Sequence, residues 1–237
     1  RPHTPFVAPK EYFDFYDRKK IEIPEVSNEY LTTLPEPAVK SIRAKKNQLN
    51  LEKELAQEIK EAYYSTITFV DAQVGRVLDH LKSLGLDKNT VVVFTSDHGY
   101  HLGEHGHWQK QTLFENSTRI PLIISSPSIK NKDVKTISPV ELIDVYPTLM
   151  DLTNINTPLH VVGKSLVPLM KDTNASVRES ALTRWRNGYT IKTKRFRLTK
   201  WGVNGELGYE LYDHKNDKNE LINLASNLEY RDVMDTL

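Results

Sequence analysis

The stretch TVVVFTSDHGYHLGEHGHWQK, residues 90 to 110, changes character in its middle. Up to Phe94 it is a continuous run of β-branched and aromatic residues, which is typical of a strand buried on both faces of a parallel sheet. Asp97 stands where this run ends, and Gly99 permits a sharp turn directly after it. Because ligands of open α/β sheets gather beyond the carboxyl ends of strands, the position predicts a functional loop.

The segments on either side of this stretch predict an α/β layout. Apolar residues recur every three or four positions from Leu51 to Leu84, which predicts a long amphipathic helix that ends at Gly85. IPLIISSP (120–127) predicts a second buried strand, and SPVELIDVYPTLMDLT (138–153) predicts another amphipathic helix. Helix, strand, loop, strand and helix is the element order of an α/β domain.

The two ends of the chain have a different texture. Frequent prolines in residues 1–40 predict a loop-rich segment, because each proline fixes φ and removes a backbone donor. After about residue 172, short alternating segments predict a small antiparallel sheet with a terminal helix in LEYRDVMDTL (228–237); they are ESALTRW (179–185), YTIKTKR (189–195), FRLTKW (196–201) and YELYDH (209–214). We therefore expect an α/β domain over residues 1–172 and a smaller α+β subdomain over residues 173–237.

Composition narrows the classes of function. The 237 residues are 38% hydrophobic and 27% charged, as in an ordinary globular protein, and the net charge of +1 creates no general field for nucleic acid or an anionic membrane. The chain has no cysteine, which excludes disulfides, thiolate metal sites and cysteine nucleophiles within it. No apolar run approaches the roughly 20 residues of a membrane helix. We expect a soluble chain with neither nucleic acid nor a membrane as partner.

The polar residues after the first strand allow several kinds of site. His101 and His105 flank Glu104, but a zinc-protease helix needs glutamate directly after its first histidine, and the glycines here break a helix. Asp97 and His98 offer an adjacent carboxylate and imidazole that could face one divalent ion, and an oxygen-rich site would favour Ca²⁺ or Mg²⁺. The alternative interpretation, that Asp97 caps the next turn and His98 packs against it, fits the residue types equally well.

Three further residues could serve a tetrahedral anion or a sugar. Lys110 is a point charge able to hold a sulfate or phosphate oxygen and to stabilise charge on a leaving group. His3 could protonate a leaving alcohol, because imidazoles exchange protons near neutral pH. Trp108 could stack on a sugar ring. Each residue type is also common on ordinary surfaces or in cores, and the pattern leaves both interpretations open.

Taken together, these motifs resemble the type I sulfatases of the alkaline-phosphatase-like superfamily, and most closely the iduronate-2-sulfatase branch. The resemblance spans the chain and rests on RPHTPF (1–6), YYSTITFVDAQVGRVLDHLKSLGL (63–86), the stretch 90–110, STRIPLIISSP (117–127), KTKRFRLTKW (192–201) and GYELYDHKNDKNELINLA (208–225). It implies an alkaline-phosphatase-like mixed sheet between helices, incomplete here, followed by a small antiparallel sheet with a helix.

The resemblance also implies roles for individual residues. Asp97 and His98 would bind one calcium ion, with Asp97 also near the nucleophile. Lys110 would hold the sulfate and its bridging oxygen, and His3 would bind sulfate and assist departure of the sugar hydroxyl. The expected substrate-binding set is Arg1, His3, His101, Trp108 and Lys110.

One part of the family pattern is not found. Sulfatases make a formylglycine nucleophile in a Cys/Ser-x-Pro-Ser-Arg motif, which follows a pair of metal-binding aspartates. SPSIK (126–130) lacks the arginine and lies on the wrong side of Asp97. We expect that this chain is the C-terminal part of a longer sulfatase. The missing N-terminal segment would then be its partner and carry the formylglycine, and the isolated chain would be inactive.

The expected activity is calcium-dependent hydrolysis of a sulfuric ester on a sulfated carbohydrate, for example the 2-O-sulfate of a uronic acid in a glycosaminoglycan. The family habit implies a secreted, periplasmic or lysosomal location. Two alternatives stay open. One is a phosphate-ester hydrolase or phosphotransferase of the same superfamily, and the other is a non-catalytic module that binds sulfated glycans.

Overall fold

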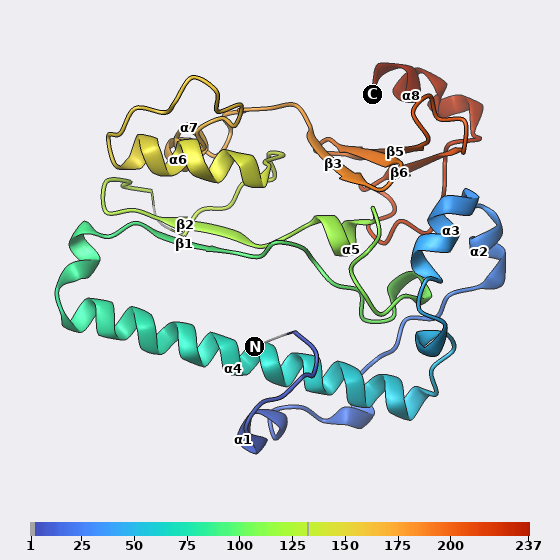
Figure 1. Ribbon diagram of the computed structural model, residues 1–237, viewed down its shortest axis with the longest axis horizontal. Helices are drawn as coiled ribbons and strands as arrows, with labels where there is room; N and C mark the ends of the chain where they lie inside the picture. The colour runs from blue at the N-terminus through green and yellow to red at the C-terminus, as the bar shows by residue number, and fades with distance from the viewer. Residues whose placement is uncertain (1–2, 132) are drawn as a thin grey trace. The chain divides into compact units, whose positions relative to one another are not determined.

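The computed structural model describes residues 3–131 and 133–237 (Figure 1). They form two compact units. The first takes in the chain up to Val26 together with Lys45–Thr90 and His101–Gln109, and the second takes in Ser27–Ala44, Val91–Tyr100 and Lys110–Leu237. The predicted boundary between residues 172 and 173 lies within the second unit and stays a prediction.

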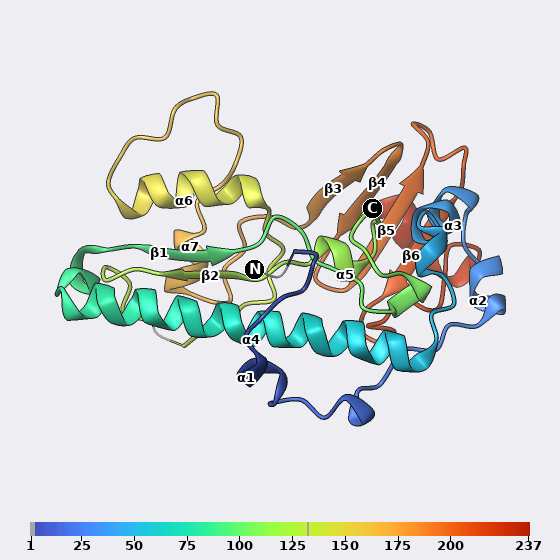
Figure 2. The ribbon, with the colours of Figure 1, turned by 60° about the horizontal axis from the view of Figure 1, so that its bottom comes forward.

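The first unit is built on one long helix, α4 (Lys53–Ser83), which is continuous along its length in Figure 2. The periodicity predicted this helix, and it ends as expected, because Gly85 adopts a left-handed φ of +69° and its N–H donates to the carbonyl of Lys82 at 2.9 Å. The short helix α1 (Lys10–Phe13) and the 3₁₀ turns η1 (Arg18–Lys20), η2 (Lys46–Gln48) and η3 (Leu86–Asn89) complete the elements before residue 90 in this unit.

The N-terminal segment is held on α4 by specific contacts. The ring of Phe6 meets the ring of Tyr63 edge-on at 5.3 Å, and the Arg18 guanidinium pairs with Glu61 at 2.6 Å. The prediction of a loop-rich start is confirmed, since residues 3–40 contain only short helices. Pro9 and Pro35 stand directly before two of them, α1 and α3 (Glu36–Ile42).

Two strands predicted to be fully buried are paired differently in the second unit. β1 (Val92–Thr95) and β2 (Leu122–Ser125) run antiparallel, with Val92 opposite Ser125 and Thr95 opposite Leu122. Ile123 on β2 is 62% exposed. The prediction of strands buried in a parallel sheet is therefore wrong for this structure. A continuous apolar run indicates an extended segment, but the direction of pairing depends on which distant segment lies beside it.

The helix predicted over residues 138–153 begins later than expected. Its first turn is the 3₁₀ segment η5 (Leu142–Asp144), and α6 (Val145–Leu152) follows directly. The side chains of Glu141 and Asp144 form a reciprocal capping box that starts the helix at this point. The short helices α2 (Asn28–Thr32), α5 (Glu115–Thr118) and α7 (Val167–Lys171) also belong to the second unit.

The C-terminal region is the four-stranded antiparallel sheet that the alternating segments predict. Its strands lie in the order β3 (Ala181–Trp185), β4 (Gly188–Lys192), β5 (Phe196–Trp201) and β6 (Tyr209–Asp213). The predicted terminal helix is present as η6 (Leu228–Tyr230) and α8 (Arg231–Thr236). The centre of the sheet is well packed, with Leu211 and Tyr212 fully buried.

The buried Glu210 of β6 makes the stability of this sheet depend on pH. Its two carboxylate oxygens accept hydrogen bonds from the Trp201 indole N–H at 2.6 Å and from the Tyr212 hydroxyl at 2.9 Å. Burial raises the pKa of Glu210 from 4.5 to about 7, against the lowering effect of these two bonds. Between these values the folded chain holds a proton that the unfolded chain has lost.

We expect the free energy of unfolding to fall as the pH rises from about 4.5 to 7, by on the order of 3 kcal/mol from this group. Glu210→Gln keeps the shape of the protonated acid and should remove this decrease. Urea unfolding at pH 5, 6 and 7 measures how the free energy of unfolding changes with pH in the parent and in the variant. Equal slopes in the parent and the variant would show that Glu210 is not the titrating group.

None of the helices formed by residues 3–131 and 133–237 combines the length and the apolar content needed to cross a lipid bilayer.

Candidate functional site

Asp97 and His98 form a polar turn directly after β1. The Asp97 carboxylate lies 3.6 Å from Nε2 of His98, with the Asp97 side chain 84% exposed and the His98 side chain 33% exposed. The Ser96 hydroxyl donates to the His98 carbonyl at 2.9 Å and holds the backbone of this turn. The pair is therefore accessible, and the backbone that carries it is held in place.

The hydrogen bonding of His98 prepares it to bind a cation. Nδ1 lies 2.7 Å from the carbonyl oxygen of Gly99, and because a carbonyl only accepts, Nδ1 carries the proton. In the neutral imidazole the lone pair then belongs to Nε2, the nitrogen that faces the Asp97 carboxylate. Two lone-pair donors side by side suit a metal ion, and a backbone carbonyl behind the other nitrogen is a common support of metal-binding histidines. The pair thus fits half of the ligand set of a divalent cation.

Gly99 is required by a close backbone approach to α5. Its N–H donates to the carbonyl of Ser117 at 2.8 Å, and a Cβ at this position would lie 2.0 Å from the carbonyl oxygen of Asn116. Any side chain would push the turn away from α5. The glycine that the sequence suggested for a sharp turn is needed instead for this contact.

The segment that carries Lys110 is supported by the same short helix. The N–H of Thr112 donates to the carbonyl of Lys110 at 3.0 Å, and the Thr112 hydroxyl donates to the hydroxyl of Ser117 at 2.9 Å. Ser117 is 5% exposed. Its carbonyl accepts from the Asp97–Gly99 turn and its hydroxyl accepts from the Lys110–Thr112 turn, so one buried residue bonds both turns. The structure thus anchors the backbones of three predicted site residues on α5.

A buried ionic network holds α5 on the C-terminal sheet. Arg197 of β5 is 2% exposed and pairs with Glu115 at the start of α5 and, through Nε at 2.6 Å, with Glu220. Glu220 also accepts from the Glu115 N–H at 2.7 Å and from Nε2 of His214 at 2.7 Å. Burial opposes ionisation of Glu220, but the Arg197 charge and these hydrogen bonds outweigh it and lower its pKa to about 2.

This network was missed by the sequence analysis. The detectable signal was Arg197 itself, a charge between the apolar residues Phe196 and Leu198 of a predicted strand, where a buried arginine needs a carboxylate partner. Glu115, His214 and Glu220 also bring three possible metal ligands within 4.8 Å of one another. The Arg197 guanidinium already supplies the positive charge there, so the geometry is that of an ion-pair network.

The histidine-rich segment of the first unit folds back on itself. The N–H of His101 donates to the carbonyl of Gln109 at 2.8 Å, and the N–H of Gly103 donates to the carbonyl of His107 at 2.9 Å, around the 3₁₀ turn η4 (Glu104–Gly106). The ring of His101 lies 5.5 Å from that of His105 and 5.0 Å from that of His107.

Two residues of this segment do not lie as predicted. His101 has no exposed surface, and Trp108 is 6% exposed. His101 has no surface with which to contact a substrate in this conformation, and the small exposed area of Trp108 is too little to stack on a sugar ring, so burial argues against the prediction that these two residues bind substrate. They fill the interior of the folded segment instead.

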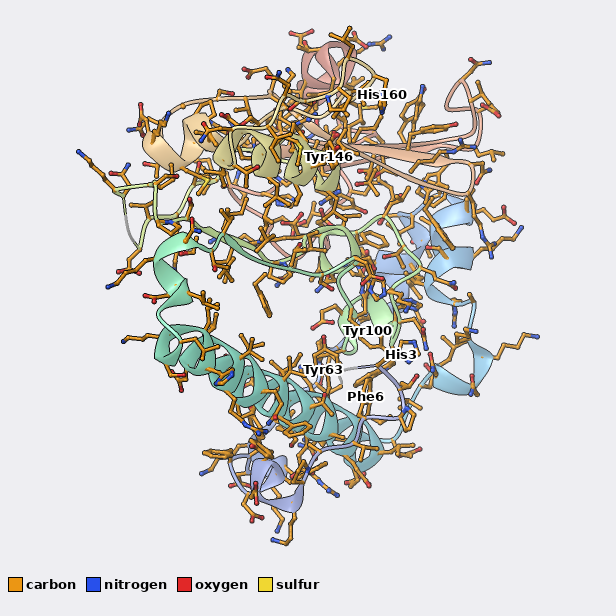
Figure 3. The ribbon with its side chains drawn as sticks, turned by 60° about the vertical axis from the view of Figure 1, so that its left-hand side comes forward. His3, Phe6, Tyr63, Tyr100, Tyr146 and His160 are labelled. Atoms are coloured by element: carbon orange, nitrogen blue, oxygen red, sulfur yellow. The ribbon has the colours of Figure 1, made fainter. Side chains whose placement is uncertain are left out.

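His3 lies in the exposed N-terminal segment, whose Phe6 contacts Tyr63 (Figure 3). Its Nδ1 lies 2.9 Å from the carbonyl oxygen of Thr4, so Nδ1 carries the proton and Nε2 is directed elsewhere. Arg1, the remaining predicted substrate ligand, lies outside the described residues.

Two family models and several known sulfatases match the chain. Residues 1–155 match the sulfatase family, and residues 103–237 match the family described as N-sulphoglucosamine sulphohydrolase, C-terminal. A sulfatase of Formosa agariphila is 33% identical over 246 residues, covering 100% of this chain and 47% of that protein. The N-acetylglucosamine-6-O-sulfatase of Bacteroides thetaiotaomicron is 33% identical over 187 residues, covering 73% of this chain and 33% of that protein.

A solved phosphonate monoester hydrolase from Silicibacter pomeroyi is also similar, with a TM-score of 0.87 and 27% identity over 100% of this chain and 52% of that chain. This match, together with the order of helices and strands and the polar turn after β1, defines a protein of alkaline-phosphatase-like fold. The chain belongs to the sulfatase family. It spans about half the length of curated relatives, 47% and 50% for two of them. The iduronate-2-sulfatase branch is not distinguished by these matches and stays a prediction.

Proposed function

We propose that the protein hydrolyses sulfuric esters of a sulfated carbohydrate, and that Asp97, His98 and Lys110 of this chain serve the reacting group. The observation that supports it most directly is the shared anchor on α5, which fixes the backbones of the cation-binding pair and of Lys110. Membership of the sulfatase family and the likeness to an N-acetylglucosamine-6-O-sulfatase support the sulfate ester and the sugar.

Each residue has a defined task in this proposal. Asp97 and His98 bind one calcium ion through the carboxylate and Nε2. Lys110 donates N–H bonds to the sulfate and its bridging oxygen, where negative charge grows as the ester bond breaks. His3, when protonated, gives a proton to the departing sugar oxygen, because a neutral alcohol leaves more readily than an alkoxide.

Two groups beyond these side chains complete the chemistry. Calcium held by Asp97 and His98 would supply positive charge beside the sulfate, and a hydrated formylglycine would supply a nucleophilic oxygen. The chain contains no cysteine and no Cys/Ser-x-Pro-Ser-Arg motif, so the nucleophile would come from a segment other than residues 1–237. We propose that this segment completes the metal site, that residues 1–237 alone are inactive, and that the protein works in a secreted, periplasmic or lysosomal location.

We propose the uronate 2-O-sulfate of a glycosaminoglycan as the substrate, because the family resemblance favours this form. A phosphate-ester hydrolase is the second candidate, because the solved phosphonate monoester hydrolase matches the whole chain. Assays of the complete protein with 4-nitrophenyl sulfate, 4-nitrophenyl phosphate and a phenylphosphonate ester separate the two. Preferred turnover of the phosphorus esters would overturn the sulfatase proposal, whereas glycan binding without any turnover would favour a non-catalytic module.

Lys110→Ala tests the site directly. We expect turnover of 4-nitrophenyl sulfate by the complete protein to fall by about a hundredfold to a thousandfold, because a charged donor to the developing anion is lost. Calcium affinity, measured by titration calorimetry, should stay unchanged, because Lys110 is not a metal ligand. Lys171→Ala, at an exposed lysine of α7, is the matched control. Normal turnover in Lys110→Ala would remove this residue from the site.

A further inference from the structure

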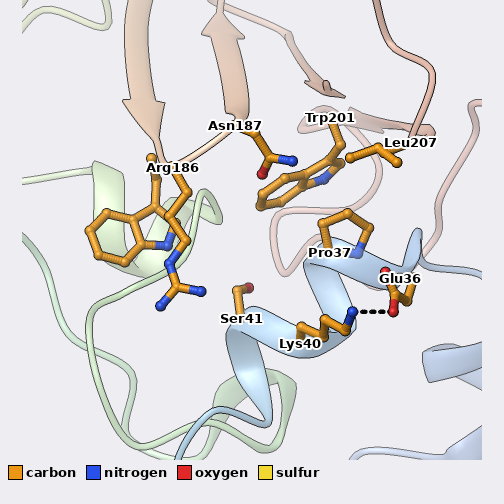
Figure 4. Close-up of a pocket in the computed structure, with 9 residues that line it drawn as sticks. Glu36, Pro37, Lys40, Ser41, Arg186, Asn187, Trp201 and Leu207 are labelled. Carbon is orange, nitrogen blue, oxygen red and sulfur yellow. Dashed lines mark ion pairs between the residues drawn. The ribbon is translucent and has the colours of Figure 1, made fainter. Parts of the chain in front are cut away.

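A cavity of about 230 Å³ lies within the second unit, between α3 and the turns at the ends of the C-terminal strands (Figure 4). Pockets for drug-sized molecules are usually about 300–1,000 Å³, so this one has room for a single ring. Its wall contains two tryptophans, Trp185 and Trp201. Neither was part of the site proposed above.

The aromatic wall is rigid. The Trp201 indole N–H is bound to Glu210 at 2.6 Å, and the ring lies over Pro37 in Figure 4. Gly188 allows this packing, because a Cβ there would lie 2.6 Å from the Trp201 ring. Trp185 is half-buried and leaves part of its ring accessible. Trp201 is only 2% exposed and supports the wall from behind, so the accessible face of Trp185 is the one that can bind the C–H side of a pyranose ring.

The polar side of the cavity carries positive charge and hydrogen-bonding groups. Lys40 pairs with Glu36 of the same helix, so the two nearly cancel. Arg186 is exposed, and no ion pair involves it among residues 3–131 and 133–237. Its guanidinium carbon lies 5.6 Å from the Trp185 ring centroid, and Figure 4 shows the side chain extended towards Ser41 of α3. A planar guanidinium is suited to two-point binding of a carboxylate or sulfate.

The backbone of Arg186 is held in an unusual conformation. Trp185 pairs with Gly188, so Arg186 and Asn187 form a two-residue hairpin turn, and Arg186 has a φ of +52°. Glycine normally occupies such positions, because a side chain is disfavoured at positive φ. The carbonyl of Asn187 accepts from the Gly202 N–H at 2.8 Å, which ties the turn to the end of β5. Residues kept in disfavoured conformations are concentrated at ligand-binding positions.

We propose that this cavity is a second, non-catalytic site that binds one acidic sugar residue of a sulfated glycan, with its ring on Trp185 and its carboxylate or sulfate on Arg186. The choice of sugar rests on the proposed function. A pyranose with an acid group has both the apolar face and the anion that this wall requires, whereas a free inorganic anion would leave the aromatic surface unused. The site would retain a polymeric substrate while another residue of the same chain is hydrolysed.

Arg186→Gly is the decisive variant. Because glycine accepts the positive φ, the melting temperature should stay the same or rise, which excludes unfolding as the cause of any loss. Binding of a heparin-derived hexasaccharide to the complete protein carrying Lys110→Ala, measured by calorimetry, should weaken about tenfold when Arg186→Gly is added, as expected for one charge-assisted contact. Arg231→Gln, at an exposed arginine of α8, controls for general surface charge.

Equal affinities with and without Arg186→Gly would overturn the proposal, as would an equal loss in Arg231→Gln. Displacement of the hexasaccharide by inorganic sulfate at the same molar concentration would show a simple anion site and no sugar recognition. Turnover of 4-nitrophenyl sulfate should be the same with and without Arg186→Gly when Lys110 is intact. If the protein fails to hydrolyse that ester but binds the hexasaccharide through Arg186, the proposed function fails and the second site stands.

Discussion

Asp97→Asn in the complete protein is expected to lower sulfate-ester hydrolysis by on the order of a thousandfold and to weaken calcium binding. Asparagine keeps the size of the side chain and one oxygen, but it removes the negative charge that faces Nε2 of His98 at 3.6 Å. Loss of a charged ligand removes several kcal/mol of the charge stabilisation that a bound cation gives to the transition state, and each 1.4 kcal/mol is about tenfold in rate.

Two measurements separate this expectation from the simpler interpretation, in which Asp97 only caps the turn. Turnover of 4-nitrophenyl sulfate measures the catalytic activity, and calorimetric titration with calcium measures whether Asp97 contributes to calcium affinity. Asp79→Asn, at an exposed aspartate of α4, is the matched control. A turn-capping role would lower the free energy of unfolding and leave calcium affinity unchanged, and that result would exclude Asp97 from the metal ligands.

Arg197→Met is expected to have the largest effect on stability, a loss of about 3–5 kcal/mol in the free energy of unfolding. Methionine fills similar space but leaves the carboxylates of Glu115 and Glu220 without their cation. Those carboxylates lie where α5 packs on the sheet. Loss of the cation should therefore also destabilise the two turns that are hydrogen-bonded to α5. Denaturant unfolding of the parent and the variant measures the difference.

The neighbouring Arg195 provides a matched comparison. It pairs with Asp213 at 2.7 Å, but its own side chain is 48% exposed, and the buried Asp213 keeps hydrogen bonds from the Lys215 N–H and the Asn216 amide. Arg195→Met should therefore cost less than Arg197→Met, about 1 kcal/mol. If the two variants lose the same stability, the buried network is not the anchor that we infer.

The network also predicts an acid dependence. Because the pKa of Glu220 is lowered from 4.5 to about 2, its contribution is present above about pH 4.5 and is lost as the pH falls towards 2. Arg197→Met should remove most of this dependence, because Arg197 provides the charge that keeps Glu220 ionised. The measurement is the change in the free energy of unfolding between pH 4.5 and pH 2, for the parent and for Arg197→Met.

Local patterns in the chain were sufficient for much of the fold. The spacing of apolar residues predicted α4 and its end at Gly85, and strict alternation predicted the four strands of the C-terminal sheet. These elements follow from periodicities that one element expresses by itself. The residue types of Asp97, His98 and Lys110, with their position after a strand, were likewise sufficient to suggest a cation and anion site.

Other features depend on segments that are distant in sequence, and only the tertiary structure decided them. The antiparallel pairing of β1 with β2 depends on residues 27 or more positions apart, and the burial of His101 depends on how its segment folds back. The burial of Arg197 between Glu115 and Glu220 and the cavity beside Arg186 are set by α3, α5 and the sheet together. The physical reason is that periodicity reports which side of an element is apolar, whereas pairing direction, buried charge and cavities are decided by which other element that side meets.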